Sequence, residues 1–292
     1  MLTRTCSSSG RTFSVDSRLP LSVWPCAQHP ARLQRRDRYV AGSTAHPAKM
    51  LPALAQHAIA AFSHAGDLVL DPMCGIGTTL VEAVHLGRNA VGVEYEPRWA
   101  ELAAANLALA EAFGAAGRGQ VRVGDARQLV SSIPRALHGR VALVLTSPPY
   151  GSSVHGRVRV EGGEVVKRDL RYSEDASNLA HVGLPTLIAA LQQIFTACAT
   201  MLRPGGVLVV TARPWRRDGV LIDFPGAVLS AAEDGSLVPV QRLVALLAGL
   251  HGDRLVPRAS FFQLQQVRKA RSAGLPLRVI AHEDVMVLRK AP

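Results

Sequence analysis

The sequence of 292 residues has few features of a secreted, zinc-binding or membrane-spanning protein. Its four cysteines, Cys6, Cys26, Cys74 and Cys198, have no C-x-x-C spacing, which argues against a zinc site or a disulfide framework. No apolar run approaches the roughly 20 residues that span a bilayer, and no signal-peptide pattern follows the N-terminus. We therefore expect a cytoplasmic protein with reduced thiols, no metal and no membrane partner.

Acidic residues are also scarce, and the formal net charge is +11. Residues 1–45 carry seven Arg and two Asp, and residues 176–292 carry thirteen basic and seven acidic side chains. The stretches 46–150 and 151–175 are each balanced. A basic surface of this kind suits a polyanion such as nucleic acid, although ordinary solvated surface explains part of the excess. The sequence gives no indication of an oligomeric state.

The chain divides into a tail and one domain. Residues 1–43 are rich in Ser and Arg without apolar periodicity, which predicts a flexible basic tail; an organellar transit peptide has similar composition. From residue 44 to 292, apolar strand patterns alternate with helical ones, and we find no internal repeat. This alternation predicts an α/β fold, a doubly wound, mostly parallel seven-stranded sheet with helices on either side and a closing antiparallel strand.

A glycine-rich turn, DPMCGIGTT, follows the first predicted strand of the domain. Gly75 and Gly77 would let the backbone approach a ligand before a helix whose N-terminus presents free N–H groups. A dinucleotide site would need a third glycine at position 80, which is Leu80, and the Asp71 carboxylate would repel a pyrophosphate. The turn therefore fits a cationic ligand better.

Carboxylates also close the next two predicted strands. Glu94 is placed to accept hydrogen bonds from both hydroxyls of a ribose, and Asp125 to accept one from an exocyclic amine. Taken singly, each carboxylate could equally be a helix cap. Three acids at successive strand ends around a glycine turn outline a nucleoside that bears positive charge, which describes S-adenosylmethionine.

With these motifs, the chain resembles a class I S-adenosylmethionine-dependent methyltransferase of the amino-methylating group, DNA cytosine-N4 or adenine-N6 type, over roughly residues 44–290. HPAKM at 46–50 resembles the segment before the cofactor loop, and TSPPY at 146–150 the catalytic motif. The resemblance implies a Rossmann-like methyltransferase fold and S-adenosyl-L-methionine as the cofactor. It assigns catalysis to Ser147, Pro148, Pro149 and Tyr150, and cofactor binding to His46, Lys49, Asp71, Pro72, Cys74, Gly75, Gly77, Thr78, Thr79, Glu94, Tyr95, Asp125 and Ala126.

The SPPY motif suits the methylation of a base amino group. The two prolines end strand pairing and stiffen the backbone, so that the Ser147 hydroxyl and the Pro148 carbonyl are held as a rigid acceptor pair. Such a pair would accept hydrogen bonds from the amino group and favour the pyramidal geometry that its nitrogen needs to attack a methyl group. Tyr150 would stack on the base, and positioning rather than a titrating base would supply most of the rate.

The serine of the motif most resembles cytosine-N4 methyltransferases acting on DNA, and some adenine-N6 enzymes share it. The same motif order occurs in tRNA guanine-N2 methyltransferases, so an RNA substrate is the second interpretation. A catalytically inactive nucleic-acid-binding regulator is the third, although the intact acids and Ser147 argue against it. The target sequence and any partner endonuclease are not readable from the chain.

Two further segments are candidates for substrate contact. The polar stretch 151–183 is too long for an ordinary connection and predicts a mobile loop that covers the substrate, with His155 and Tyr172 as base contacts. RPWRR at 213–217 follows a strand, which puts Arg213, Trp215, Arg216 and Arg217 beside the catalytic motif for phosphate binding and stacking. The alternative is that Trp215 packs into the core and the arginines are solvated or paired with nearby acids.

Overall fold

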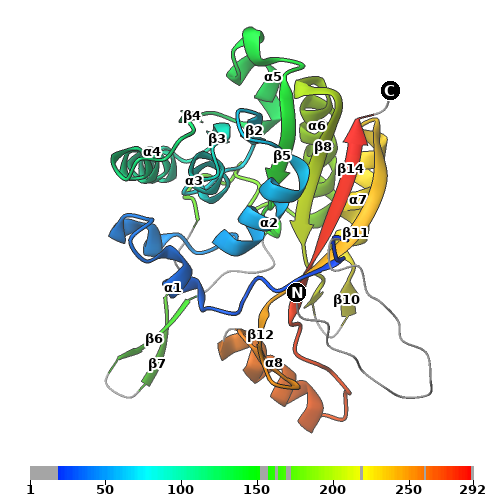
Figure 1. The fold of residues 1–292 in the computed structure, drawn as a ribbon. Coiled ribbons are helices and arrows are strands. Elements are labelled where there is room, and N and C mark those ends of the chain that lie inside the picture. Colours follow the sequence, from blue (N-terminus) through cyan, green and yellow to red (C-terminus); the bar gives the residue numbers. More distant parts are fainter. Residues whose placement is uncertain are drawn as a thin grey trace, which may run out of the picture.

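The computed structural model describes residues 19–151, 157–161, 164–168, 172–217, 220–259 and 261–290. The side chains of 157–168, Arg217, Phe261 and Phe262 lie outside this description, as does all of His155. Within the described ranges, helices and strands alternate around one central sheet, as the sequence predicts (Figure 1).

The central sheet is mostly parallel, and its only antiparallel strand among the described residues is β14, which runs against β11 and β8. The strands lie in the order β1 (Val23–Trp24), β11 (Leu237–Leu246), β14 (His282–Lys290), β8 (Leu202–Ala212), β5 (Val141–Thr146), β2 (Leu68–Asp71), β3 (Asn89–Glu94) and β4 (Gly119–Val123). The predicted doubly wound sheet with a closing antiparallel strand is confirmed. It has eight strands rather than seven, because β1 adds to its edge.

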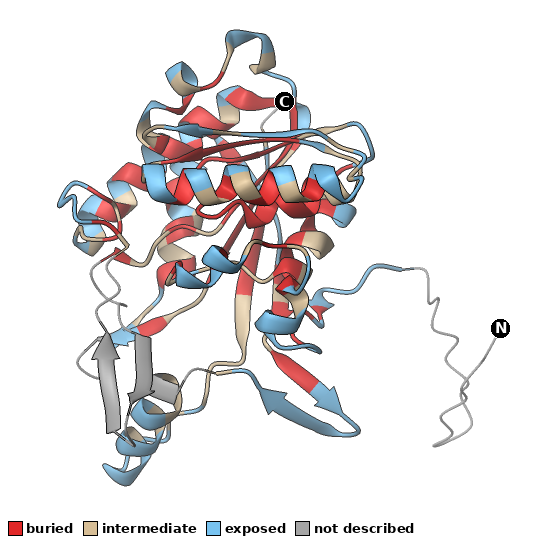
Figure 2. Cartoon of the chain, turned by 90° about the vertical axis from the view of Figure 1, so that its left-hand side faces the viewer, coloured by how far each residue is buried: buried red, intermediate tan, exposed pale blue. Residues whose placement is uncertain are grey.

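Helices cover both faces of the sheet, since the side chains of each inner strand alternate between two apolar clusters. On β5, Leu143 and Leu145 pack with the first helix layer and Val144 with the second. The first layer is α2 (Pro52–Phe62), α3 (Thr78–His85) and α4 (Pro97–Ala112); the second is α5 (Leu129–Ser132), α6 (Leu184–Met201) and α7 (Phe224–Asp234). Figure 2 shows the buried residues as the layer between exposed helix faces.

The N-terminal segment is folded from residue 19 onward. Trp24 is buried and stacks on His57 with ring centroids 5.6 Å apart. Further along, the Tyr39 hydroxyl donates to the buried Glu82 carboxylate at 2.7 Å, and Arg38 forms an ion pair with the same group. The tail predicted for residues 1–43 is therefore wrong for 19–43. Composition misled the prediction because these few anchoring contacts are made to residues distant in sequence.

Most of the smaller elements lie at the carboxyl end of the parallel strands, whereas η3 precedes the amino end of β5. They include three antiparallel hairpins, a helix inserted between β11 and β14, and short helical turns. Their bounds are β6 (Arg157–Glu161) with β7 (Glu164–Arg168), β9 (Trp215–Arg217) with β10 (Val220–Ile222), β12 (Ala248–His251) with β13 (Arg254–Pro257), α8 (Phe261–Ser272), α1 (Ala31–Arg35), η1 (Ala41–Ala45), η2 (Ala126–Gln128) and η3 (Arg135–Leu137). Helix α8 is inserted directly before the last strand, β14.

Helix α6 is more apolar than the sequence survey indicated. Its 18 residues have a mean hydropathy of 1.3, which by length and composition alone would suit a membrane span. Leu187, Leu191 and Phe195 are fully buried and pack with the sheet and α7. A helix that covers the core of an α/β sheet has the same composition, so α6 is explained by its place in the fold.

Candidate active site

The carboxyl ends of β2, β3, β4 and β5 open onto one cavity of about 1730 Å³. Nearly every predicted cofactor and catalytic residue lines it. These are His46, Lys49, Asp71, Pro72, Cys74, Gly75, Thr78, Thr79, Glu94, Tyr95, Asp125, Ala126, Ser147, Pro148, Pro149 and Tyr150. Of the predicted cofactor residues, Gly77 alone does not line the cavity.

The glycine turn after β2 is held in its shape by Asp71. This buried carboxylate accepts hydrogen bonds from the Thr79 hydroxyl at 2.6 Å and from the Met73 N–H at 3.1 Å. Burial raises the pKa of Asp71 to about 6. Gly75 and Gly77 have φ of +55° and +79°, which favours glycine at both positions.

Close packing adds a second reason for the two glycines. A Cβ on Gly75 would lie 3.0 Å from the His46 ring, and one on Gly77 would lie 3.1 Å from the Cβ of Ala103. A side chain at either position would therefore displace the turn from His46 or from α4.

HPAKM packs against the turn and lines the cavity beside it. The buried His46 ring meets the rings of Trp99 and Tyr172 edge-on, with centroids 4.7 and 5.0 Å away. Lys49 donates to the backbone carbonyls of Thr44 and His46, so its ammonium group braces its own segment. The sequence placed both residues in the site, and the structure shows how the segment keeps its form.

Glu94, at the end of β3, is an almost fully buried acid of the cavity. Its carboxylate accepts from the backbone N–H groups of Gly75 at 2.8 Å and Glu96 at 2.9 Å. The Tyr172 hydroxyl donates to both of its oxygens, at 3.0 and 3.1 Å. Burial raises the pKa of Glu94 to about 7, although these hydrogen bonds oppose the rise.

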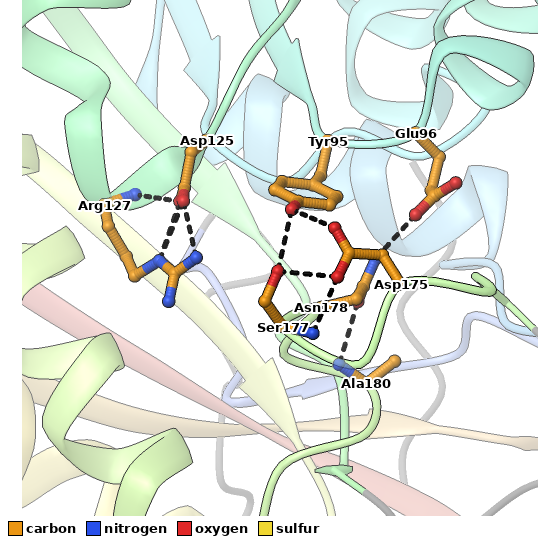
Figure 3. A network of polar contacts seen from close by, with 8 residues as sticks. All are labelled: Tyr95, Glu96, Asp125, Arg127, Asp175, Ser177, Asn178 and Ala180. Atoms are coloured by element: carbon orange, nitrogen blue, oxygen red, sulfur yellow. Dashed lines mark hydrogen bonds and ion pairs between the residues drawn. The ribbon is translucent and has the colours of Figure 1, made fainter.

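Asp125, at the end of β4, is paired with Arg127. The guanidinium donates to both carboxylate oxygens at 2.6 to 3.0 Å, and the Arg127 N–H caps the same group at 2.8 Å (Figure 3). Burial would raise the pKa of Asp125, but the bonds and charge of Arg127 outweigh it, so the pKa lies below its ordinary value. Asp125 is thus held as a carboxylate, able to accept from an amine.

Residues 172–181, here called the strap, line the cavity beside the end of β3 and the start of α4. The Tyr95 hydroxyl donates to Asp175 at 2.5 Å and lies 3.0 Å from the Ser177 hydroxyl, while Asn178 donates to Glu96 at 3.0 Å (Figure 3). At its start, the Tyr172 carbonyl accepts from the Trp99 indole at 3.0 Å. The strap belongs to the segment predicted to cover the site. Tyr172 faces the predicted ribose acid, whereas the sequence suggested that it contacts the base.

The SPPY motif leaves β5 directly into the cavity, and Tyr150 is supported there by an aromatic cluster. Its ring lies 5.4 Å from Trp215 in an edge-on contact and 5.3 Å from Phe224. The Arg213 guanidinium lies 5.8 Å from the same ring. Trp215 is only 8% exposed, so it packs as in the alternative considered from the sequence, while Arg213 and Arg216 line the cavity.

Two of the remaining predicted substrate residues, His155 and the Arg217 side chain, fall outside the described part of the chain. Conversely, the sequence survey missed Arg127 and Glu283. The spacing of Arg127, two residues after Asp125, was the available signal. Glu283 lines the cavity because β14 runs antiparallel, which brings the start of that strand to the edge where the parallel strands end.

Parts of the chain are similar to known methyltransferases. Residues 7–105 match a family model described as DNA methylase. Curated relatives include the type II methyltransferase M.MjaII of Methanocaldococcus jannaschii, 30% identical over 74 residues, which are 25% of this chain and 14% of that protein. The tRNA (guanine(10)-N2)-dimethyltransferases of the same organism and of Methanothermobacter thermautotrophicus are 32% and 33% identical over 118 and 145 residues.

These matches are partial. The two tRNA enzymes align with 40% and 49% of this chain and with 33% and 39% of their own length, so the chain spans less than two fifths of the curated relatives it matches. Among solved structures, TrmN from Thermus thermophilus superposes with a TM-score of 0.52 at 18% identity, over 89% of this chain and 53% of that one. That likeness shows the fold.

Proposed function

We propose that this chain is an S-adenosylmethionine-dependent amino-methyltransferase that acts on an exocyclic amino group of a nucleic-acid base. The match of residues 7–105 to a DNA methylase model and the partial alignment with a type II methyltransferase support this proposal. One observation carries the proposal: the SPPY motif at the end of β5 lines the same cavity as Asp71, Glu94 and Asp125. The residues expected to hold the methyl donor and those expected to hold the acceptor therefore face one enclosure, where positioning can supply much of the rate.

The residues of the cavity fit S-adenosylmethionine. The Glu94 carboxylate suits ribose hydroxyls, Asp125 suits the adenine amino group, and the turn at Gly75 lets backbone N–H groups approach closely. Asp71 supports this turn through Thr79 and adds negative charge near a sulfonium. When bound, the cofactor supplies an electrophilic methyl group.

The SPPY residues would prepare the amine. The Ser147 hydroxyl oxygen and the Pro148 carbonyl accept hydrogen bonds from the two N–H groups of the amine. This draws the nitrogen lone pair out of conjugation with the ring and aims it at the methyl group. Tyr150 presents an aromatic surface to the base, held in place by Trp215 and Phe224. After methyl transfer, the amine loses one proton to solvent.

DNA is our first choice of substrate, with cytosine N4 ahead of adenine N6. The family match to DNA methylases and the serine of the motif favour this choice. A base in a duplex would have to be flipped into the cavity, at a cost of a few kcal/mol. RNA guanine N2 is the second candidate, favoured by the longer alignments with the two tRNA dimethyltransferases.

Isothermal calorimetry of cofactor binding tests the first half of the proposal. Glu94→Ala should weaken S-adenosylmethionine binding roughly ten- to a hundredfold, because a hydrogen bond to a charged group typically contributes about 1.5 to 3 kcal/mol. Glu101→Ala, on the exposed side of α4, is the matched control and should bind as the wild type does. Equal affinity in all three proteins would remove Glu94 from the ribose site and weaken the proposal.

A further inference from the structure

The insertion 248–281, between β11 and β14, forms the outer wall of the cavity. It contains β12, β13 and α8, and in Figure 1 it lies beyond the carboxyl edge of the sheet, apart from the helices that cover the two faces. The β11–β14 pairing places both of its ends at this edge, with Leu246 opposite His282. Among the residues that line the cavity are Pro257, Gln263, Gln266, Val267, Ala270 and Leu277.

The insertion is fixed to the core rather than loosely attached. The Arg258 guanidinium donates to the carbonyls of Ala27 and Gln28 at 3.4 and 3.3 Å. Gln28 in turn accepts from the Leu250 N–H at 3.2 Å. The N-terminal segment thus holds the insertion in place, and the wall that it forms has a defined position relative to SPPY.

Helix α8 turns one face to the cavity. Gln263, Gln266, Val267 and Ala270 line the cavity, and their spacing of three and four residues places them on a single helical stripe. Gln263 also donates to the Ile280 carbonyl at 3.0 Å, which ties the stripe to the segment before β14. A polar and small face of this kind leaves room for a ligand between α8 and the catalytic motif.

The remaining surface of the insertion is strongly basic. It carries six basic residues, Arg254, Arg258, Arg268, Lys269, Arg271 and Arg278, against the single acid Asp253. Lys269 and Arg271 are exposed and flank the cavity-facing stripe of α8 on its two sides, whereas Arg268 lies on the opposite face of the helix. A charge of this density around a substrate cavity matches the phosphates of a polynucleotide.

We propose that the insertion 248–281 is the nucleic-acid docking surface, with Lys269 and Arg271 binding phosphates that flank the target base and Gln266 contacting a neighbouring base. This inference rests on the proposed function, because it takes the cavity to be the place of methyl transfer. Glutamine amides pair with base edges, whereas cations bind the backbone independently of sequence. Affinity and sequence preference are therefore carried by different side chains of one helix.

Salt-dependent binding tests the phosphate contacts. Fluorescence anisotropy with a labelled DNA duplex and, separately, a labelled tRNA compares the wild type with the double variant Lys269→Ala, Arg271→Ala. Removing one side chain that neutralises a phosphate makes the log–log salt slope shallower by roughly 0.7 to 0.9. The slope of the double variant should therefore be shallower by about 1.4 to 1.8, and its affinity at low salt should be roughly tenfold weaker or more, with unchanged S-adenosylmethionine affinity.

The matched control is Arg135→Ala with Arg140→Ala, two exposed arginines next to the amino end of β5, on the opposite edge of the sheet. It should keep the wild-type slope. An α8 double variant that also keeps the wild-type slope would overturn the inference while leaving the proposed function standing. If the slope becomes shallower in the α8 variant alone but the wild type methylates neither nucleic acid, the docking surface holds and the proposed function fails.

Sequence preference tests Gln266. With a pool of substrates randomised beside the target base, Gln266→Ala should methylate with a flatter preference at one neighbouring position and an unchanged salt slope. An identical preference profile in wild type and variant would overturn the assignment of Gln266 to base contact. If wild-type protein binds neither DNA nor tRNA, the whole docking surface is refuted.

Discussion

The Tyr172 hydroxyl donates to both oxygens of the Glu94 carboxylate, 78 residues earlier in the chain, at distances of 3.0 and 3.1 Å. Two backbone N–H groups already donate to this carboxylate. A carboxylate offers about four lone-pair sites, and a ribose would add two more donors to the three present. Binding both ribose hydroxyls therefore requires Tyr172 to leave, since the backbone donors are fixed by the fold.

Removing the Tyr172 hydroxyl should consequently tighten cofactor binding. In Tyr172→Phe the ribose no longer competes with an internal donor, and the ring can keep its edge-on contact with His46. We expect about tenfold higher S-adenosylmethionine affinity, from the usual strength of a hydrogen bond to a charged group. Calorimetry measures it. Weaker binding by the variant would show instead that Tyr172 stays and supports the bound ribose.

Cofactor affinity should depend on pH through Glu94. Its pKa is raised to about 7 by burial, so below that pH the free site carries a protonated carboxyl that must lose its proton to accept both ribose hydroxyls. Affinity should fall as the pH drops from 8 to about 6, by up to tenfold per unit of pH below the pKa. Glu94→Gln should bind weakly with little pH dependence. A wild-type affinity that is flat over this range would contradict the raised pKa.

The same shift predicts how stability changes with pH. Because the pKa of Glu94 is higher in the folded than in the unfolded chain, the folded state holds the extra proton, and this contribution is lost as pH rises from about 4.5 through about 7. Relative to Glu94→Gln, the wild type should lose stability over that window. Chemical denaturation of both proteins at pH 5 and pH 8 measures the difference. A difference that does not change with pH would show that Glu94 titrates normally.

Much of the site was readable from the sequence because strand alternation determines which residues meet. Asp71, Glu94, Asp125 and Ser147 each end a predicted parallel strand, and parallel strands deliver their carboxyl ends to one edge of the sheet. Gly75 and Gly77 could also be predicted as turn residues, since residues other than glycine seldom adopt a positive φ.

Contacts between distant segments were not readable. The two-residue strand β1 has no pattern of its own and exists because Val23 and Trp24 pair with β11, more than 200 residues away. Tyr172 lies in a polar segment with no periodicity, and only the folded chain brings it to Glu94. Glu283 lies near the start of an antiparallel strand, whereas the prediction considered only residues at the carboxyl ends of strands.

Ser147 and Tyr150 should affect different steps. Ser147→Ala removes one acceptor for the amine and should lower the methylation rate with little change in cofactor affinity, as loss of a preorganised group does. Tyr150→Ala should also weaken nucleic-acid binding, by about 1 to 3 kcal/mol if the ring stacks on a base. Single-turnover rates and binding isotherms separate the two. If Ser147→Ala kept the wild-type turnover, the SPPY motif would be a structural turn without a catalytic role.

Trp215 should act through packing. It is buried against Phe224 at 4.9 Å and Tyr150 at 5.4 Å, and no hydrogen-bond partner for its indole N–H is found among the described residues. Trp215→Ala should destabilise the protein by about 3 to 5 kcal/mol, the usual cost of such a truncation. Trp215→Phe should lose far less and keep its activity. Thermal unfolding distinguishes them, and a stable Trp215→Ala protein that only loses nucleic-acid affinity would instead favour a stacking role.

The central claim is that the cavity joins a methyl donor to a base amino group. Its most direct test is to incubate the protein with isotope-labelled S-adenosylmethionine and DNA, tRNA or ribosomal RNA separately, then digest each and identify the labelled nucleoside by mass spectrometry. We expect label on an exocyclic amino group, N4-methylcytosine in DNA first, and much slower labelling by Ser147→Ala. Label on a ring carbon, a ring nitrogen or a ribose hydroxyl, or labelling by Ser147→Ala at the wild-type rate, would contradict the claim.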